Sequence, residues 1–189
     1  KNILLTDKKT LNAFAKGQTD DVFQFESPGM KKILRKCKPE RFEDLTVLNA
    51  LYRPGPMDYI PIYINYKQNP ETIHYPDPCL EEILKETYGL IVYQEQLMQV
   101  AKKIAGYSLG EADMLRRAMG KKRPEILMYK KKDFVECAMK RGFTEENASQ
   151  IYEILIPFAG YGFNKSHAVA YTKMAFWDMY LKMHYNEEY

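Results

Sequence analysis

The stretch Ser108-Leu109-Gly110-Glu111-Ala112-Asp113-Met114-Leu115-Arg116-Arg117-Ala118-Met119-Gly120 decides the fold class, because it carries a complete set of helix signals. Ser108 and Glu111 have the spacing of a capping box, in which a hydroxyl and a carboxylate each satisfy a free backbone amide at a helix start. Three apolar residues recur on one face before the terminal glycine: Ala112, Leu115 and Met119. The sequence therefore predicts an amphipathic helix over residues 108–120.

The segments on both sides of this helix repeat its pattern. Asp7, Ser27, Pro124 and Thr144 are residues typical of helix starts, and apolar residues follow each of them at helical spacing. After a predicted turn at residues 160–162, a long final helix is expected to bury one face, formed by Ala170, Met174, Trp177, Leu181 and His184. We expect an all-α fold of many helices with at most a minor β element.

Residues 54–92 interrupt the helical pattern. Six prolines lie between residues 54 and 80, and proline breaks both helices and central strands. This segment is expected to be an irregular connection rich in Pro and Tyr, with one short helix around residues 60–67. It divides the chain into N-terminal helices (1–53), the connection (54–92) and a second helical part (93–189).

Composition excludes several classes of protein. The longest apolar runs fall far short of the ~20 residues that span a bilayer, and no signal peptide is recognisable. The three cysteines, Cys37, Cys79 and Cys137, are far apart, which favours reduced thiols in a cytoplasmic protein over disulfides. The three histidines are equally dispersed, so no zinc motif is visible. Because the chain starts without Met and stops within helix-like sequence, we expect it to be a piece of a longer protein.

Basic residues are concentrated between positions 116 and 132. Eight cations stand there against one acid, Glu125, so this window carries +7 and the remainder of the chain −4. The cations are Arg116, Arg117, Lys121, Lys122, Arg123, Lys130, Lys131 and Lys132. Such a run is typical of a surface that binds a polyanion, although it can also be a solvated helix face.

Two catalytic motifs are matched only in part. Gly106-Tyr107-Ser108-Leu109-Gly110 fits the nucleophile elbow of serine hydrolases, but that elbow follows a strand, and here a helix precedes a serine that already serves as a cap. Residues 160–166 contain glycines and a lysine, yet they lack the Gly-Lys pair of a phosphate-binding P-loop. A glycine turn followed by Asn164, Lys165, Ser166 and His167 at a helix start still favours anion binding.

Five blocks resemble a known family. They are residues 22–30 (VFQFESPGM), 51–56 (LYRPGP), 87–96 (TYGLIVYQEQ), 113–122 (DMLRRAMGKK) and 158–167 (FAGYGFNKSH). In content and order they are similar to the alpha subunits of bacterial DNA polymerase III, the C-family replicative DNA polymerases. The resemblance covers nearly the whole chain.

The resemblance implies a fingers domain that follows a palm domain in the same chain. It implies that Arg116 and Arg117 meet the triphosphate of the incoming dNTP, and that Asn164, Lys165, Ser166 and His167 lie near its sugar. The basic residues Lys121, Lys122, Arg123, Lys130, Lys131 and Lys132 are then expected to contact the DNA primer-template. The implied partners also include the sliding clamp and other replisome subunits, with no membrane. On residue pattern alone, Arg116 and Arg117 could instead pair with Asp113 on the helix surface.

Polymerase chemistry requires carboxylates that hold two metal ions. The acid-x-acid pair Glu111 and Asp113 falls on a predicted helix, where such neighbours do not face each other. We therefore expect no catalytic and no metal-binding residue in this chain, with Mg²⁺ held by the palm of the intact polymerase and the chain inactive by itself. The alternatives are a helical nucleic-acid-binding domain without enzymatic activity and a serine hydrolase.

Overall fold

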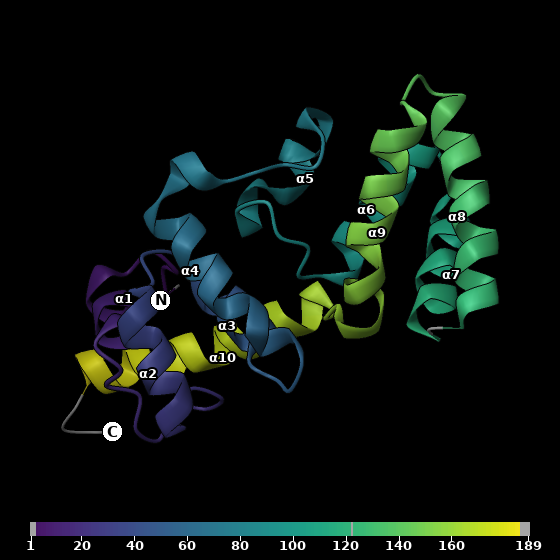
Figure 1. Cartoon of the computed structure of the whole chain (residues 1–189). Coiled ribbons are helices and arrows are strands. Elements are labelled where there is room, and N and C mark those ends of the chain that lie inside the picture. The colour runs from purple at the N-terminus through teal and green to yellow at the C-terminus, as the bar shows by residue number, and fades with distance from the viewer. Residues whose placement is uncertain (1–2, 122, 186–189) are drawn as a thin grey trace. The chain divides into compact units, whose positions relative to one another are not determined.

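The computed structural model describes residues 3–121 and 123–185, and these are mostly helical (Figure 1). The β structure found among them is one isolated parallel bridge between Tyr93 and Phe163. The prediction of an all-α fold with at most a minor β element is confirmed. The chain divides into unit 1 (Lys1–Gln68 with Lys165–Tyr189) and unit 2 (Asn69–Asn164). The division predicted at residues 53 and 92 stays a prediction.

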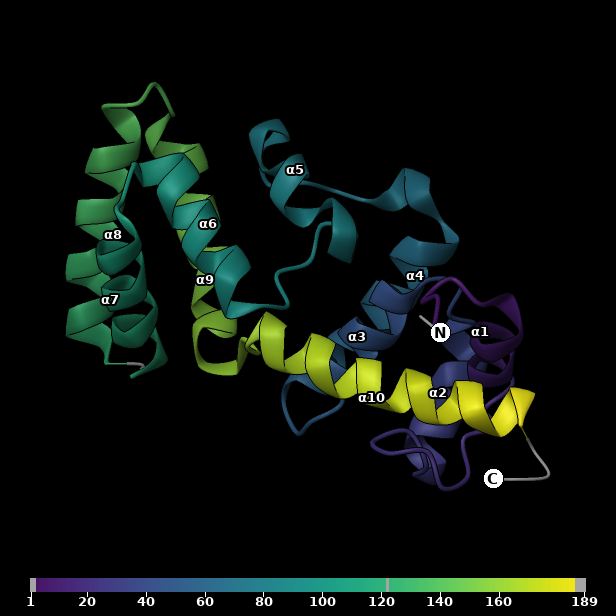
Figure 2. The same cartoon turned by 180° about the vertical axis from the view of Figure 1, so that it is seen from behind.

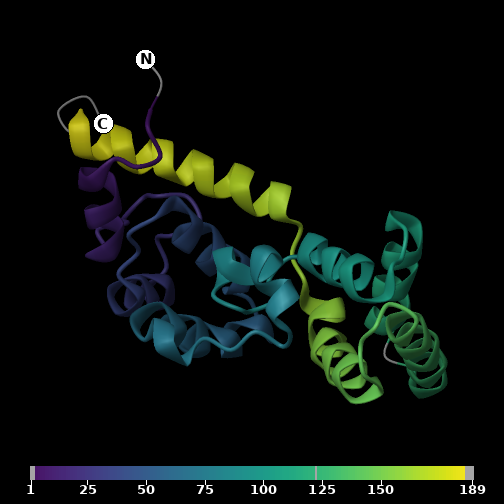
Figure 3. The ribbon, with the colours of Figure 1, turned by 90° about the horizontal axis from the view of Figure 1, so that it is seen from above.

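Unit 1 is built around an aromatic cluster. Its elements are α1 (Lys8–Ala15), α2 (Pro28–Cys37), α3 (Phe42–Leu51), the 3-10 turn η1 (Pro56–Tyr59), α4 (Ile60–Gln68) and α10 (Lys165–His184). Helix α10 packs against α1 and α3, and Figure 3 shows α1 below one end of it. The ring of Phe176 in α10 lies 6.2 Å from Phe14 and 5.9 Å from Phe42, measured between ring centroids. These rings exclude water from the centre of the unit.

The face that α10 buries differs from the predicted one. Met174, Trp177 and Leu181 are 52%, 41% and 45% exposed, whereas the buried residues are Ala168, Thr172, Ala175, Phe176 and Met179. Helix α10 carries apolar residues around most of its circumference, so spacing alone does not identify the inner side. The contacts of Phe176 with the aromatic cluster determine which side of α10 is buried.

The described part of unit 2 is a group of four long packed helices preceded by one short helix and several 3-10 turns. Its elements are η2 (Pro70–Thr72), η3 (Pro78–Leu80), α5 (Glu81–Leu84), η4 (Lys85–Thr87), α6 (Gln94–Ala105), α7 (Leu109–Gly120), α8 (Pro124–Met139) and α9 (Glu145–Tyr161). Figure 2 shows α6 to α9 side by side, in agreement with the packing of α8 on α9 and of α6 on α7. Phe134 of α8 is fully buried between Tyr107 and Tyr152, at centroid distances of 6.1 and 5.5 Å. Unit 2 thus holds its long helices on a core of its own.

Local signals in the sequence set most helix starts. The side chains of Asp7, Ser27 and Thr144 accept hydrogen bonds from the amides of Thr10, Met30 and Asn147, respectively. Pro124 is the first residue of α8, as predicted. One boundary is wrong: α9 passes through Pro157 and Gly160 as far as Tyr161, so the predicted turn at 160–162 begins later.

The structure also answers two questions about the class of protein: whether a described helix could cross a membrane, and whether the cysteines form disulfides. No helix in the described residues is both long and apolar enough to cross a membrane. The three cysteines are free thiols, and burial raises the pKa of Cys37 to about 12, which keeps that thiol protonated at neutral pH.

Candidate nucleotide and nucleic-acid interface

Helix α7 presents the two arginines of the central motif, and one aspartate bridges them. Arg116 donates from Nη2 and Nε to Oδ1 of Asp113, at 2.8 and 3.1 Å. Arg117 pairs through Nε with Oδ2 of the same carboxylate, at 2.8 Å. The hydrogen bond from Arg116 and the charges of both guanidiniums hold the pKa of Asp113 below its usual range. The carboxylate is therefore ionised at neutral pH, and the three side chains together keep a net charge of +1.

The two arginines differ in exposure. The side chain of Arg116 is 20% exposed and that of Arg117 is 70% exposed. Helix α7 holds them in place through its buried residues Ala112, Leu115 and Met119, which confirms the predicted inner face. A Cβ at Gly120 would lie 3.4 Å from the carbonyl oxygen of Ala159, so the end of α7 runs close to the backbone of α9. The arginine pair thus stands on a rigidly packed helix.

The start of α7 is fixed by the predicted capping box. The Ser108 hydroxyl donates to Oε2 of Glu111 at 2.7 Å and accepts from the Glu111 amide at 3.3 Å, while the Ser108 amide donates to Glu111 at 2.8 Å. The serine is engaged at both its hydroxyl and its amide, and a helix precedes it. These contacts argue against the serine hydrolase alternative, since a nucleophile elbow places its serine after a strand and Ser108 follows a helix with its hydroxyl engaged in a cap.

The basic run is divided between several surfaces of unit 2. Lys131 pairs with Glu153 of α9 at 2.8 Å, and Lys132 lies 4.0 Å from Glu136 on its own helix. Lys130 lies 5.7 Å from the centroid of the neighbouring Tyr129 ring. Consecutive helical residues point about 100° apart, so three adjacent lysines cannot share one face. Lys121 and Arg123 are exposed just before α8, and Lys122 lies outside the described residues.

Helix α8, which carries the three lysines, is tied down at two points. The hydroxyl of Tyr107 donates to Oδ2 of Asp133 at 2.5 Å, and the hydroxyl of Tyr152 donates to the carbonyl oxygen of Leu127 at 2.8 Å. Burial, with the carboxylate of Asp133, raises the pKa of Tyr107 above its ordinary value. Tyr107 therefore stays protonated as a donor, and the basic helix keeps a defined orientation within unit 2.

The segment around Asn164 is anchored to the start of α6. The amide of Gln94 donates to the carbonyl oxygen of Phe163 at 3.0 Å, and the amide of Phe163 donates to that of Val92 at 3.1 Å. The side-chain amide of Asn164 donates to Oε1 of Glu95 at 2.9 Å. Asn164 is thus held in place by a helix residue that lies 69 positions earlier in the chain.

The other three predicted nucleotide-site residues begin α10 and belong to unit 1. Ser166 and His167 are exposed there, and the His167 ring lies 4.1 Å from the Tyr171 ring between centroids. Arg116, Arg117 and Asn164 belong to unit 2. The nucleotide-binding assignment therefore draws on residues from both units, and it stays a prediction for all six.

Sequence reasoning missed the role of Gln96. Its Oε1 accepts from the amides of Val92 and Tyr93 at 2.9 and 3.0 Å, and its Nε2 donates to the hydroxyl of Thr87 at 2.8 Å. Gln96 is 4% exposed and shapes the chain just before α6. Its position three residues after a helix N-cap is a capping-box signal that could have indicated this role.

The residues that the structure describes contain no group of three or more His, Cys, Asp or Glu side chains placed to hold a metal ion. These residues do not fit the metal site of a polymerase. The described part of the chain thus supplies no set of ligands to which a metal-dependent step could be assigned.

The fold and site together define an all-helical domain that presents a bridged arginine pair and a basic helix. A model of the bacterial DNA polymerase III alpha subunit finger domain matches residues 1–142. The chain belongs to the bacterial DNA polymerase III alpha subunit family, and it corresponds to the finger domain.

Curated relatives agree with this family. The chain is 59% identical over 183 residues to the DNA polymerase III subunit alpha of Treponema pallidum (strain Nichols), with 97% of this chain and 16% of the relative covered. It is 55% identical over 185 residues to the same subunit of Halalkalibacterium halodurans, with 98% and 17% covered. For the subunit of Bacillus subtilis (strain 168), the identity is 48% over 184 residues, with 97% and 16% covered. The chain thus spans about a sixth of the length of these relatives.

Proposed function

We propose that this chain is the nucleotide- and DNA-binding part of a DNA-directed DNA polymerase that works in replication. The observation that carries the proposal is the arginine pair on α7, in a chain that belongs to the finger-domain family. Two adjacent guanidiniums offer forked donors to phosphate oxygens, which is the geometry that a triphosphate requires. Family membership favours this function over a nucleic-acid-binding domain without enzymatic activity. Single-turnover incorporation by Arg116→Ala and Arg117→Ala variants of the whole polymerase tests it.

In the same proposal, Asn164, Lys165, Ser166 and His167 lie beside the sugar of the bound dNTP. The bond from Asn164 to Glu95 supports a fixed position for the first of them, because Glu95 stands in the first turn of a packed helix. A site that selects between deoxyribose and ribose must exclude one hydroxyl group, and a fixed side chain does so better than a mobile one.

We also propose that Lys121, Lys122, Arg123, Lys130, Lys131 and Lys132 contact the phosphates of the primer-template. The exposure of Lys121, Arg123 and Lys132 supports this assignment. Lys131 differs from them, since it must leave Glu153 or share it before it can meet a phosphate. We expect Lys131 to contribute less than Lys132.

Changing Lys130, Lys131 and Lys132 together to Gln in the whole polymerase is expected to make DNA binding less sensitive to salt. Each phosphate contact contributes ~0.9 to the slope of log affinity against log salt on duplex DNA, because binding releases counterions. The slope should therefore fall by roughly 1 for each phosphate that the altered side chains no longer neutralise. Fluorescence anisotropy with a labelled primer-template, measured between low and moderate salt, gives the slope.

A matched control separates local contacts from net charge. Changing the exposed lysines Lys8, Lys16 and Lys38 of unit 1 to Gln removes the same charge and should leave the slope unchanged. Equal slopes for the α8 triple variant and the parent would show that these lysines are a solvated helix face.

The whole polymerase is proposed to use Mg²⁺ bound outside the described residues, and to work with the palm domain of the same chain, the sliding clamp and other replisome subunits in the cytoplasm. Since these functions concern the longer protein, primer extension by the 189-residue chain alone is expected to be absent. This expectation stays a prediction.

A further inference from the structure

The carboxylate of Asp113 binds two cations, one through each of its oxygens. Oδ1 accepts both bonds from Arg116, and Oδ2 accepts the bond from Arg117, all at 2.8–3.1 Å. The arginines follow it by three and four residues, the two spacings that bring helical side chains together. Each oxygen of one carboxylate thus holds a different guanidinium.

The bonds to Asp113 use only the inner edge of each guanidinium. Arg116 engages it through Nε and Nη2, and Arg117 through Nε. A guanidinium has five N–H donors, so the terminal amino group Nη1 of Arg116 and both terminal amino groups of Arg117 are not used in these bonds. The outer edges can therefore meet phosphate oxygens while the inner edges remain bound.

A carboxylate between two guanidiniums also changes their electrostatics. Two like charges on adjacent residues repel each other, and an opposite charge within hydrogen-bond distance of both reduces that repulsion. An unrestrained arginine would have to be ordered when the nucleotide binds. Asp113 orders both beforehand, although its negative charge also weakens their attraction for the ground-state triphosphate.

We propose that Asp113 is a positioning residue for nucleotidyl transfer, which holds Arg116 and Arg117 with their outer donors directed at the triphosphate. The proposal rests on the proposed function of the arginine pair. It implies that Asp113 affects the rate of incorporation more than the binding of the nucleotide. Fixed guanidiniums stabilise the transition state most, because negative charge develops there, whereas in the ground state the charge of Asp113 offsets more of the gain from orientation.

The test is single-turnover incorporation by an Asp113→Asn variant of the whole polymerase. Asn keeps the shape of the side chain but loses the negative charge, and an NH2 donor replaces one of the two acceptor oxygens. We expect the maximal rate to fall about tenfold or more, as for a misplaced catalytic group, with the apparent nucleotide affinity nearly unchanged. Asp113→Glu should recover part of the rate, since a longer carboxylate on the same helix face still reaches both arginines.

A double-mutant comparison shows whether Asp113 acts through the arginines. Adding Asp113→Asn to an Arg116→Ala, Arg117→Ala background should cause no further loss of rate, because the residues that it positions are already gone. Glu146→Gln, which removes an exposed carboxylate that accepts from Gln150 on α9, is the control of equal charge and should behave like the parent.

The outcomes separate the two proposals. If Arg116→Ala and Arg117→Ala slow incorporation while Asp113→Asn keeps the parental rate, the positioning role is wrong and the proposed function stands. The positioning role is also wrong, and the proposed function still stands, if Asp113→Asn slows the Arg116→Ala, Arg117→Ala double variant as strongly as it slows the parent. If the arginine variants themselves incorporate at the parental rate, the proposed function fails first.

Discussion

Replacing Arg116 or Arg117 with Ala in the whole polymerase is expected to lower the single-turnover rate and to weaken nucleotide binding, while the affinity for the primer-template stays nearly intact. Removing one charged hydrogen bond costs about 1.5–3 kcal/mol, or roughly ten- to a hundredfold in specificity for the nucleotide. Arg117 is the more exposed of the two and can reach a ligand with the smaller rearrangement.

The physical reason lies in the charge that develops during transfer. As the bond between the α- and β-phosphates breaks, negative charge gathers on the departing pyrophosphate. Fixed guanidiniums therefore stabilise the transition state more than the ground state. Substitution by Lys should recover only part of the loss, because it restores the charge without the forked donors.

Arg141→Ala provides the control for this experiment. Arg141 follows α8 in the same unit, and its side chain packs beside Gly106 at the end of α6, outside the proposed interface. Its removal should leave nucleotide kinetics at the parental level. Parental rate and parental apparent nucleotide affinity in both α7 variants would defeat the assignment, and the arginines would then be surface partners of Asp113 alone.

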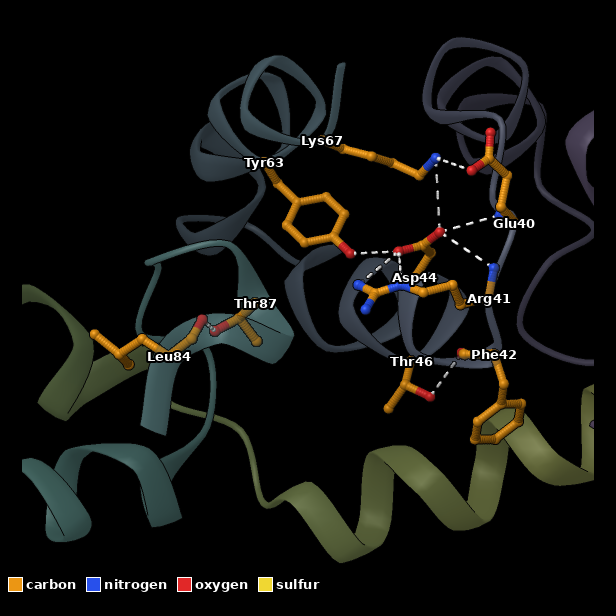
Figure 4. A network of polar contacts seen from close by, with 9 residues as sticks. All are labelled: Glu40, Arg41, Phe42, Asp44, Thr46, Tyr63, Lys67, Leu84 and Thr87. Atoms are coloured by element: carbon orange, nitrogen blue, oxygen red, sulfur yellow. Dashed lines mark hydrogen bonds and ion pairs between the residues drawn. The ribbon is translucent and has the colours of Figure 1, made fainter. Parts of the chain in front are cut away.

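Replacing Asp44 with Ala is expected to destabilise unit 1 by about 3–5 kcal/mol, because it breaks a buried charged network. Asp44 is fully buried at the start of α3, and Figure 4 shows the groups that surround it. Its oxygens accept from the amide of Glu40 at 3.0 Å, from the Arg41 side chain at 3.2–3.3 Å and from the hydroxyl of Tyr63 at 2.8 Å. Nζ of Lys67, whose side chain is 8% exposed, lies 3.8 Å away.

The loss is large since two of the partners, Tyr63 and Lys67, have little access to water when the carboxylate is removed. The Tyr63 hydroxyl is buried and the Lys67 ammonium is nearly so, and both would lose an acceptor. Urea unfolding of the 189-residue chain measures the effect. Trp177, the single tryptophan, lies in α10 of the same unit and reports its unfolding by fluorescence.

Glu40→Ala is the matched control for Asp44→Ala. Glu40 also pairs with Lys67, at 3.5 Å, but its side chain is 79% exposed. An exposed ion pair contributes about 0–1 kcal/mol, so this variant should stay close to the parent. A free energy of unfolding for Asp44→Ala within about 1 kcal/mol of the parent would contradict a network of this strength.

The parts of the fold that sequence predicts are those fixed by neighbouring residues. Ser108 and Glu111 form the expected cap because both partners lie within one helical turn. Thr144 and Asp7 are confirmed for the same reason. A capping bond depends on three or four residues, so it can be predicted without any knowledge of the tertiary structure.

Contacts between distant segments could not be predicted in this way. Asn164 and Glu95 are 69 residues apart, and nothing local connects them. The predicted inner face of α10 was wrong since Phe176 and Trp177 are equally apolar, and only the packing on α1 and α3 distinguishes them. The Asp44 network could not be predicted because an acid near a helix start is ordinarily exposed.

The candidate site depends both on local contacts, which the sequence predicts, and on contacts between distant segments, which it does not. The Arg116–Asp113 contact follows from helical spacing, and the structure has it. The direction of the outer guanidinium donors and the pairing of Lys131 with Glu153 depend on how α7, α8 and α9 pack, which the sequence does not display.

The most direct test of the central claim compares two ligands that differ by one phosphate. Equilibrium binding of a dNTP and of the corresponding dNDP to the polymerase–primer-template complex is measured for the parent, for Arg116→Ala, for Arg117→Ala and for Arg141→Ala. If the arginine pair binds the triphosphate, the ratio of the affinities for dNTP and dNDP should fall by about tenfold or more in Arg117→Ala. It should stay unchanged in Arg141→Ala. An undiminished preference in Arg117→Ala and in the corresponding Arg116→Ala variant would contradict a triphosphate-binding role for the pair.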